Sequence, residues 1–286
     1  MAEPARRAPA PEDSELSSDD PYRYGSGLRR VRLPDGRVEV REVPLTPEDF
    51  LDPQVGDQLT QNSFHHEFVT DLSDMIRRRY ESNPDVLVSS DLKMRWGIPG
   101  LRNPSPDLAV IPGIRDKKAI RRSFAVQKEG TKPCLVVEVV SDDPVIRSKD
   151  HKEKVTIYER AGIREYLILD PPFVTPSGCF QMTARRLDPK GRYQLVEPDG
   201  QGGFLSETTG LWFCLTPDRQ EVYLIDTETG KRLESSTELA ARAALAEARV
   251  AREAEARREA EARTAETEAE NARLREALDR LRKSGS

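Results

Sequence analysis

The stretch that decides the fold is Cys-Leu-Val-Val-Glu-Val-Val, residues 134–140, the most continuous apolar run of the chain. A short run of this kind, rich in β-branched side chains, predicts a strand buried on both faces of a sheet. Glu138 interrupts it. A buried carboxylate costs several kcal/mol unless it is paired or bound to a cation, so Glu138 needs a positively charged partner.

The segments on either side of this strand predict the elements next to it. Residues 108–111 form a second apolar run, and Asp107 stands at its mouth after two prolines. On the other side, a helix is predicted over residues 150–161. Asp150 and Glu153 form a pair resembling a capping box at its start, and Gly162 stops it. Residues 165–170 then predict another buried strand.

Three residues of this predicted helix share one face, because Asp150, Lys154 and Tyr158 are spaced four apart. Two acids on neighbouring strands and a lysine on the next helix can converge at one end of a sheet. Two carboxylates suit a hard divalent cation such as Mg²⁺ or Mn²⁺. A nearby lysine can orient or deprotonate a water molecule and stabilise charge on a phosphate. Asp150 also suits a helix N-cap, and Lys154 suits a purely structural ion pair with Glu138.

The remaining segments predict an α/β fold with a mixed sheet flanked by helices. Phe64, Phe68, Leu72 and Ile76 recur every four residues and predict a helix over residues 62–80. A short helix should begin at Thr46, with a proline in its first position. Strands are predicted at residues 86–88 and 92–96, and antiparallel hairpins after residue 185. Helices alternating with strands in this order favour an α/β core.

Composition divides the chain into three parts. Residues 1–41 are rich in Pro, Ser and charged residues and predict a disordered tail, ending in a hairpin around residues 34–36. Residues 42–235 hold the folded domain. Residues 236–286 are mostly Ala, Glu and Arg and predict a long helix. Its heptad seam is polar in the centre and apolar at its ends, so it favours either a coiled coil that joins a homodimer or a lone charged helix.

The net charge of −5 disfavours a protein that coats DNA, but it is compatible with a local basic rim around an acidic site. Basic clusters at residues 77–79 and 115–122 are candidates for that rim. Three widely spaced cysteines suit thiols in a reducing compartment. The sequence shows neither an apolar leader nor a membrane-spanning run, so we expect a cytoplasmic protein.

Four linked motifs carry a resemblance to a known family. They are Ser105-Pro106-Asp107, Val137-Glu138-Val139-Val140-Ser141, Asp150-x3-Lys154-x3-Tyr158 and Ala161-Gly162-x2-Glu165-Tyr166. In order and spacing they resemble the bacterial Uma-type putative restriction endonuclease family of the PD-(D/E)XK nuclease superfamily. The resemblance covers about residues 45–233.

The resemblance implies a role for each candidate residue. Asp107 and Glu138 would bind Mg²⁺ or Mn²⁺, with the backbone carbonyl of Val139 as a third ligand. The superfamily places a lysine two residues after the glutamate, where this chain has Val140. The resemblance moves that role to Lys154 on the following helix. Lys149 and Lys152 are fallback candidates, and the family often has a histidine near the site, which here is His65.

These expectations favour a metal-dependent endonuclease that hydrolyses DNA, with Asp107, Glu138 and Lys154 as its catalytic residues. Asp150, Tyr158 and His65 are secondary candidates. The alternative is a catalytically inactive protein of the same fold that binds nucleic acid or assembles through its helical tail. Another phosphate-containing substrate is a third hypothesis, because a fold alone does not fix the substrate.

Overall fold

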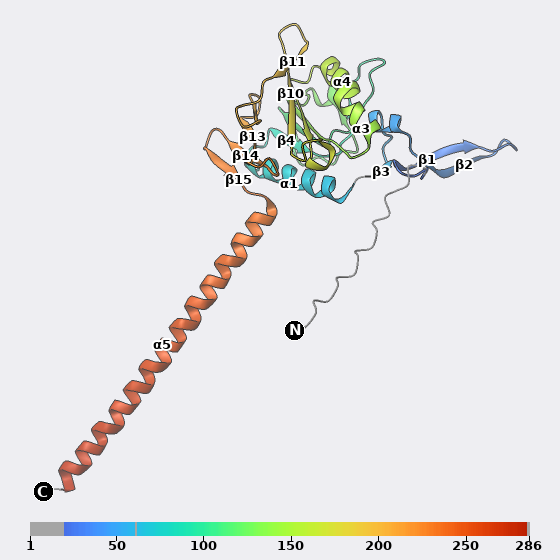
Figure 1. Ribbon diagram of the computed structural model, residues 1–286. Coiled ribbons are helices and arrows are strands. Elements are labelled where there is room, and N and C mark those ends of the chain that lie inside the picture. The colour runs from blue at the N-terminus through green and yellow to red at the C-terminus, as the bar shows by residue number, and fades with distance from the viewer. Residues whose placement is uncertain (1–19, 61, 285–286) are drawn as a thin grey trace, which may run out of the picture. The chain divides into compact units, whose positions relative to one another are not determined.

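Strand β8 (Leu135–Val139) lies inside a six-stranded sheet of the computed structural model, which describes residues 20–60 and 62–284 (Figure 1). It pairs antiparallel with β6 (Leu108–Pro112) and parallel with β9 (Glu165–Asp170), so the sheet is mixed. All five residues of β8 are buried, as its apolar run predicts. The sheet has the order β11-β10-β9-β8-β6-β4, completed by β4 (Val86–Ser89), β10 (Gln181–Leu187) and β11 (Tyr193–Val196).

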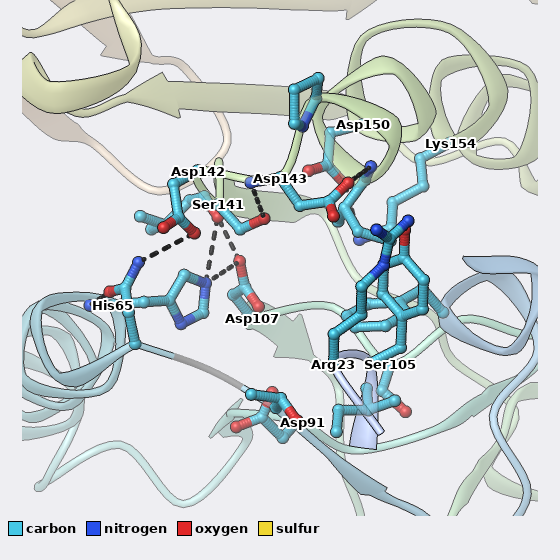
Figure 2. Close-up of a pocket in the computed structure, with 18 residues that line it drawn as sticks. Arg23, His65, Asp91, Ser105, Asp107, Ser141, Asp142, Asp143, Asp150 and Lys154 are labelled. Atoms are coloured by element: carbon cyan, nitrogen blue, oxygen red, sulfur yellow. Dashed lines mark hydrogen bonds and ion pairs between the residues drawn. The ribbon is translucent and has the colours of Figure 1, made fainter. Parts of the chain in front are cut away.

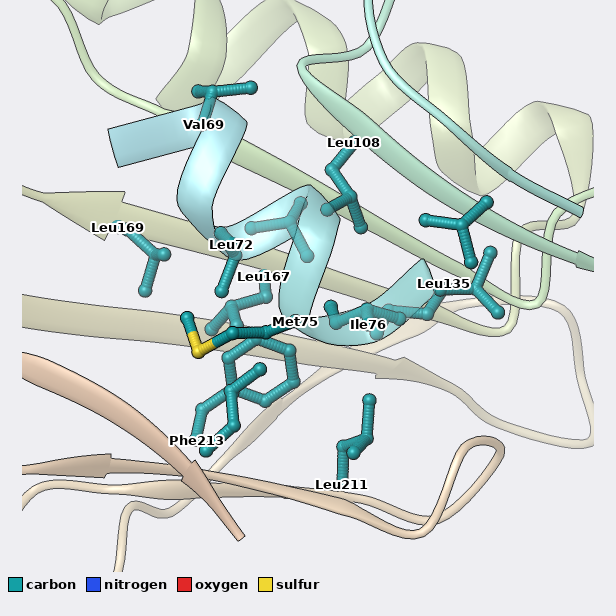
Figure 3. Close-up of a cluster of buried hydrophobic side chains, with 14 of the residues drawn as sticks. Val69, Leu72, Met75, Ile76, Leu108, Leu135, Leu167, Leu169, Leu211 and Phe213 are labelled. Atoms are coloured by element: carbon teal, nitrogen blue, oxygen red, sulfur yellow. The ribbon is translucent and has the colours of Figure 1, made fainter. Parts of the chain in front are cut away.

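The two faces of this sheet carry separate hydrophobic cores, because side chains alternate along each strand. Leu135, Val137 and Val139 pack with helix α1 (Ser63–Arg79). Figure 3 shows Leu72, Met75 and Ile76 of α1 between the sheet and Phe213. Val136 and Val140 pack on the opposite face with helix α4 (Lys154–Ala161). Glu138 shares the α4 side, so alternation decides which helix its carboxylate meets.

A second, four-stranded sheet adds to the core on the α1 side. Phe204, Leu211, Phe213 and Leu224 from its strands are buried in the same cluster as Leu72 and Ile76. The sheet has the order β12-β13-β14-β15, formed by β12 (Phe204–Ser206), β13 (Leu211–Leu215), β14 (Val222–Asp226) and β15 (Lys231–Leu233). The described residues thus form the predicted α/β fold, with a mixed sheet flanked by helices.

The two helices predicted before the sheet are confirmed. Helix α1 begins after Asn62, whose side-chain oxygen accepts a hydrogen bond from the His65 backbone N–H at 2.8 Å. The short 3-10 helix η1 (Pro47–Leu51) has Thr46 as its N-cap. Asn62 thus satisfies a backbone N–H group that the first helical turn leaves without a partner, whereas at Thr46 the Asp49 side chain accepts a hydrogen bond from the backbone N–H of the cap residue.

The helix that follows β8 differs from the prediction at its start. It begins with α3 (Pro144–Ser148), capped by Asp143, and passes through a π-helical turn, η2 (Lys149–Glu153), into α4. The prediction of Asp150 as an N-cap is therefore wrong, because Pro144 starts the helix six residues earlier. The predicted stop is confirmed, since Gly162 takes a left-handed φ of +68°.

The N-terminal segment forms a hairpin instead of a disordered tail between residues 25 and 41. Strand β1 (Gly25–Arg32) pairs antiparallel with β2 (Val38–Pro44). The turn lies at residues 34–36, as predicted, and Gly36 supplies a φ of +85°. Strand β1 also pairs with β3 (Gln58–Leu59), which joins the hairpin to the α/β core. Residues 1–19 of the predicted tail lie outside the described residues.

Short elements complete this part of the chain. Strands β5 (Met94–Arg95) and β7 (Phe124–Ala125) pair in parallel, and Met94 and Phe124 are fully buried on the α4 side. Helix α2 (Val126–Glu129) ends at Gly130, and a 3-10 turn, η3 (Pro172–Val174), follows β9.

Residues 234–286 separate from the rest as a second unit, which consists of helix α5 (Ser236–Ser284). Its described side chains are mostly exposed, among them Leu245, Val250, Leu274 and Leu278. Arginine–glutamate pairs four residues apart, such as Arg249–Glu253 and Arg257–Glu261, support it along its length. Across the residues that the structure describes, no helix has the length and apolarity needed to cross a membrane.

Candidate active site

A cavity of about 600 Å³ opens beside the ends of β6 and β8 (Figure 2). Three parts of the fold enclose it: the start of α1, the helix that follows β8, and the base of the N-terminal hairpin. The predicted residues Asp107, Val139, Asp150, Lys154 and His65 line its wall. Its other polar and charged side chains are Arg23, Thr60, Asn62, Asp91, Ser105, Ser141, Asp142 and Asp143.

Asp107 is fixed by the strand next to it. Its Oδ2 accepts a hydrogen bond from the Val139 N–H at 2.7 Å, and its own N–H lies 3.4 Å from Glu138 Oε2. The register explains this contact. Leu108 pairs with Val137 across β6 and β8, so the next step brings Asp107 opposite Glu138 and Val139.

His65 reaches the same point from α1. Its Nε2 lies 3.2 Å from Asp107 Oδ2 and 3.0 Å from the Val139 carbonyl oxygen. Burial lowers the pKa of His65, but the Asp107 carboxylate outweighs burial and raises it to about 9. A protonated imidazole therefore stands between two oxygen atoms that the resemblance proposes as metal ligands.

Glu138 lies behind this wall, on the α4 side of the sheet. Its Oε2 pairs with Lys154 Nζ at 3.0 Å, and its Oε1 accepts a hydrogen bond from the Tyr158 hydroxyl at 2.5 Å. Lys154 also pairs with Asp150 at 2.8 Å, and the Tyr166 hydroxyl donates to the Asp150 backbone oxygen. The structure thus brings together Glu138, Lys154, Asp150 and Tyr158, the residues of the predicted helix face and strand.

The charges in this cluster do not balance. Three buried carboxylates, those of Asp107, Glu138 and Asp150, face two buried basic groups, those of His65 and Lys154. Burial, together with the other two acids, raises the pKa of Glu138 to about 8, although Lys154 opposes this. Burial lowers the pKa of Lys154, and the surrounding acids raise it further than burial lowers it, so the ammonium stays charged. The surplus negative charge favours binding of a further cation or proton.

The fallback lysines have other surroundings. Lys149 is buried, but its Nζ pairs with Glu48 and Glu153, each at 3.2 Å. Lys152 is exposed on the helix. Of the two, neither lines the cavity, whereas Lys154 does.

The predicted basic rim is partly used for structure. In the basic cluster at residues 77–79, Arg79 pairs with Asp226 at 3.1 Å. In the second, Arg121 pairs with Glu129 at 2.9 Å, and Lys117 caps the backbone oxygens of residues 80 and 83. Arg122 lines a smaller cavity that shares Asp91 with the first. Only part of the rim therefore faces the site.

Several cavity residues were not predicted from the sequence, chiefly Asp91, Asp142 and Asp143. Asp91 sits in a loop with a left-handed φ of +51°, a conformation that Asp tolerates better than most residues. A polar Ser-Ser-Asp stretch gives only a turn signal, so nothing in the pattern ties it to the site. Asp143 has a clearer signal, because an acid directly before a proline is typical of a helix start.

The donors at this point match a hard cation in kind. Asp107, Glu138 and the Val139 carbonyl offer oxygen atoms, which Mg²⁺ and Mn²⁺ prefer. Among the described residues, no group of three or more His, Cys, Asp or Glu side chains is arranged to hold a metal ion. The position of His65 Nε2 shows that two of these donors already converge on one cationic group.

Comparison with known proteins places this geometry in a family. Residues 56–218, more than half of the chain, match the family Uma2, described as "Putative restriction endonuclease". The chain belongs to this family. The matched residues include Asp107, Glu138 and Lys154 and nearly all of the cavity wall. Membership in Uma2 confirms the resemblance of the four motifs and places the chain among nuclease-type proteins.

One similar solved structure is a protein from Anabaena variabilis, described as a "putative nuclease belonging to DUF820". It is 15% identical in sequence and aligns with a TM-score of 0.36, over 55% of this chain and 88% of that one. No curated protein matches the chain.

Proposed function

We propose that this Uma2 protein is a divalent-metal-dependent endonuclease that hydrolyses phosphodiester bonds of DNA. The observation that supports this most is the surplus of acidic groups at the end of β6 and β8, where five aspartates and three basic residues line the cavity and the buried Glu138 lies behind its wall. A purely structural cluster would gain stability from balance. A site that accepts a divalent cation instead gains stability when the cation binds.

The chain supplies a role for each residue. Asp107, Glu138 and the Val139 carbonyl would hold Mg²⁺ or Mn²⁺, which polarises the phosphate and lowers the pKa of a bound water. Asp107 is oriented for this by the Val139 N–H. His65 keeps the two nearest oxygen atoms together through its Nε2.

Lys154 acts as a charged donor in this scheme. Because Asp150 and Glu138 hold its ammonium protonated, it cannot take the proton of the attacking water. It instead donates hydrogen bonds that orient water and stabilise negative charge on the phosphate. Asp150 and Tyr158 position Lys154 and Glu138, so both are positioning residues.

The test is cleavage of supercoiled and single-stranded DNA with Mg²⁺ or Mn²⁺. Asp107→Asn should slow cleavage about 10²–10³-fold, the range for loss of one electrostatic group from an active site. Lys154→Met should do the same. Lys149→Met is the matched control, because it removes a buried, ion-paired lysine of the same helix that lies outside the cavity. Equal cleavage by Asp107→Asn and wild type would contradict the proposal.

One observation favours the alternative, a catalytically inactive nuclease fold that binds nucleic acid or assembles. Both oxygens of Glu138 already have partners, Lys154 and Tyr158, within the protein. If this ion pair is purely structural, Mn²⁺ should not raise the melting temperature of the wild type. If the site binds metal, saturation about 100-fold above Kd adds about 2.7 kcal/mol to the free energy of unfolding, and Asp107→Asn removes this gain.

We further propose that helix α5 joins two copies of the chain. Leu274 and Leu278, four residues apart near its end, are exposed and lie on one face. A homodimer would suit an enzyme that cuts both strands of DNA. Sedimentation of wild type and of Leu274→Glu/Leu278→Glu tests this, because the dimer predicts a halved mass for the variant.

A further inference from the structure

The two faces of the N-terminal hairpin differ in what they contact. Across β1 and β2, Leu28 lies opposite Glu42, Arg30 opposite Val40, and Arg32 opposite Val38, so these six residues share one face. All six are exposed. The three apolar side chains stand out at 54–66% exposure. We call this face of the hairpin the outer face. Its exposed apolar and charged side chains are typical of a surface that binds a partner.

The opposite face holds the hairpin in place. Arg29 forms two hydrogen bonds with Asp57, from Nη1 to Oδ1 at 2.6 Å and from Nη2 to Oδ2 at 2.8 Å. A bidentate pair of this kind fixes orientation as well as distance. Since Asp57 precedes β3 in the core, the hairpin is fastened near its base while its outer face is left open.

The arginines of the hairpin also differ between the two faces, in whether an acidic side chain pairs with them. Arg37 pairs with Asp35 and Arg41 pairs with Glu39, at 2.7 and 3.0 Å. Over residues 20–60 and 62–284, no acidic side chain forms an ion pair with Arg30 or Arg32. Glu42, the one acidic residue on the outer face, is included in this statement about the described residues. Two guanidinium groups therefore extend into solvent beside three apolar side chains.

The hairpin continues directly into the candidate active site. Arg23 and Tyr24, just before β1, line the large cavity together with Leu59 of β3. Figure 1 shows the hairpin reaching outward from the side of the core where β3 lies. A linear polymer that places one phosphate in the cavity can thus run along the hairpin. Residues 25–44 also lie outside the matched part of the family, residues 56–218.

We propose that the outer face of this hairpin docks in the major groove of duplex DNA next to the scissile bond. The major groove admits a two-stranded β-ribbon. Arg30 and Arg32 provide the positive charge that DNA backbones and guanine edges attract, and Val38 and Val40 suit the methyl groups of thymine. This rests on the proposed function, because it names the element that holds the DNA substrate of the same site.

The experiment measures binding without hydrolysis. A labelled 20-bp duplex is titrated with full-length protein in a chelator, at several salt concentrations, and anisotropy gives Kd. Arg30→Ala/Arg32→Ala should weaken duplex binding about tenfold or more and lower the slope of log Kd against log salt by about 2. The matched control, Arg37→Ala/Arg41→Ala, removes the same charge from the same hairpin and should leave the slope unchanged.

Each other outcome overturns the hairpin proposal. An equal loss in the control variant would show a general charge effect. An equal loss on a single strand of the same sequence would exclude groove docking, and a change of sedimentation mass would point to contact between copies of the chain. No duplex binding by the wild type would also overturn it.

The binding experiment tests the hairpin proposal separately from the nuclease proposal. Asp107→Asn should keep the hairpin-dependent salt slope, because Asp107 lies at the cavity and not on the hairpin. Loss of binding in Arg30→Ala/Arg32→Ala, without cleavage by any form of the protein, would support the hairpin and refute the nuclease. Cleavage that depends on Asp107, together with duplex binding that is unchanged in Arg30→Ala/Arg32→Ala, would support the nuclease proposal and refute the hairpin proposal.

Discussion

Glu138 and Glu165 are buried glutamates on the neighbouring parallel strands β8 and β9, and they are satisfied in different ways. Glu165 accepts hydrogen bonds from Ser206, Thr208 and the Glu207 N–H, and pairs with Arg186 at 2.9 Å. Glu138 has Lys154 and Tyr158, and two further carboxylates close by. The comparison teaches that burial of an acid is not enough to mark a site. A surplus of acids beside a cavity is the distinguishing feature.

The largest expected difference concerns cleavage. Glu138→Gln keeps the shape of the side chain but removes the carboxylate that would hold the cation, so DNA cleavage with Mg²⁺ or Mn²⁺ should fall about 10²–10³-fold. Because Lys154 retains Asp150, the free energy of unfolding should change by only about 1 kcal/mol. Cleavage assays and urea denaturation measure the two effects. A large loss of stability with cleavage intact would make Glu138 the structural acid of the pair.

Glu165 should behave in the opposite way. Glu165→Ala leaves the hydroxyls of Ser206 and Thr208 without their acceptor and Arg186 without its buried partner, and should cost about 3 kcal/mol. The cleavage rate per folded molecule should not change. Glu207→Ala is the control, since it removes an exposed acid from the same arginine and should affect urea denaturation little. Comparable losses from both variants would refute the assignment of Glu165.

The smallest expected effect distinguishes the hydroxyl groups of Tyr158 and Tyr166. Tyr158→Phe removes the donor to Glu138 and should lower cleavage about tenfold, the size expected for a group that orients a metal ligand. Tyr166→Phe removes a donor to the Asp150 backbone oxygen. Both should cost about 1 kcal/mol of stability. If single-turnover cleavage falls equally in the two variants, orientation of Glu138 by Tyr158 is not the cause.

The sequence predicted the central strand, helix α1 and the stop at Gly162, because each depends on local spacing or a local cap. It also predicted that Asp107, Glu138 and Lys154 would converge, since strand order and helix phase bring them to one end of the sheet. It predicted the hairpin turn at residues 34–36 but not the length of the hairpin, because its arginine-rich strands resemble a solvated tail until Arg29 meets Asp57. Asp91 was missed because its place in the cavity depends on loop geometry, which no periodicity encodes.

The π-helical turn between α3 and α4 has a consequence for how this site tolerates change. A π turn holds one residue more than an α turn, and it lies just before Lys154. Winding residues 149–153 as an ordinary α-helix, with no residue deleted, would rotate every later side chain by about 100°. Lys154 and Tyr158 would then face away from Glu138, although no functional residue had been replaced. The site is thus encoded by the winding of this helix as well as by residue type.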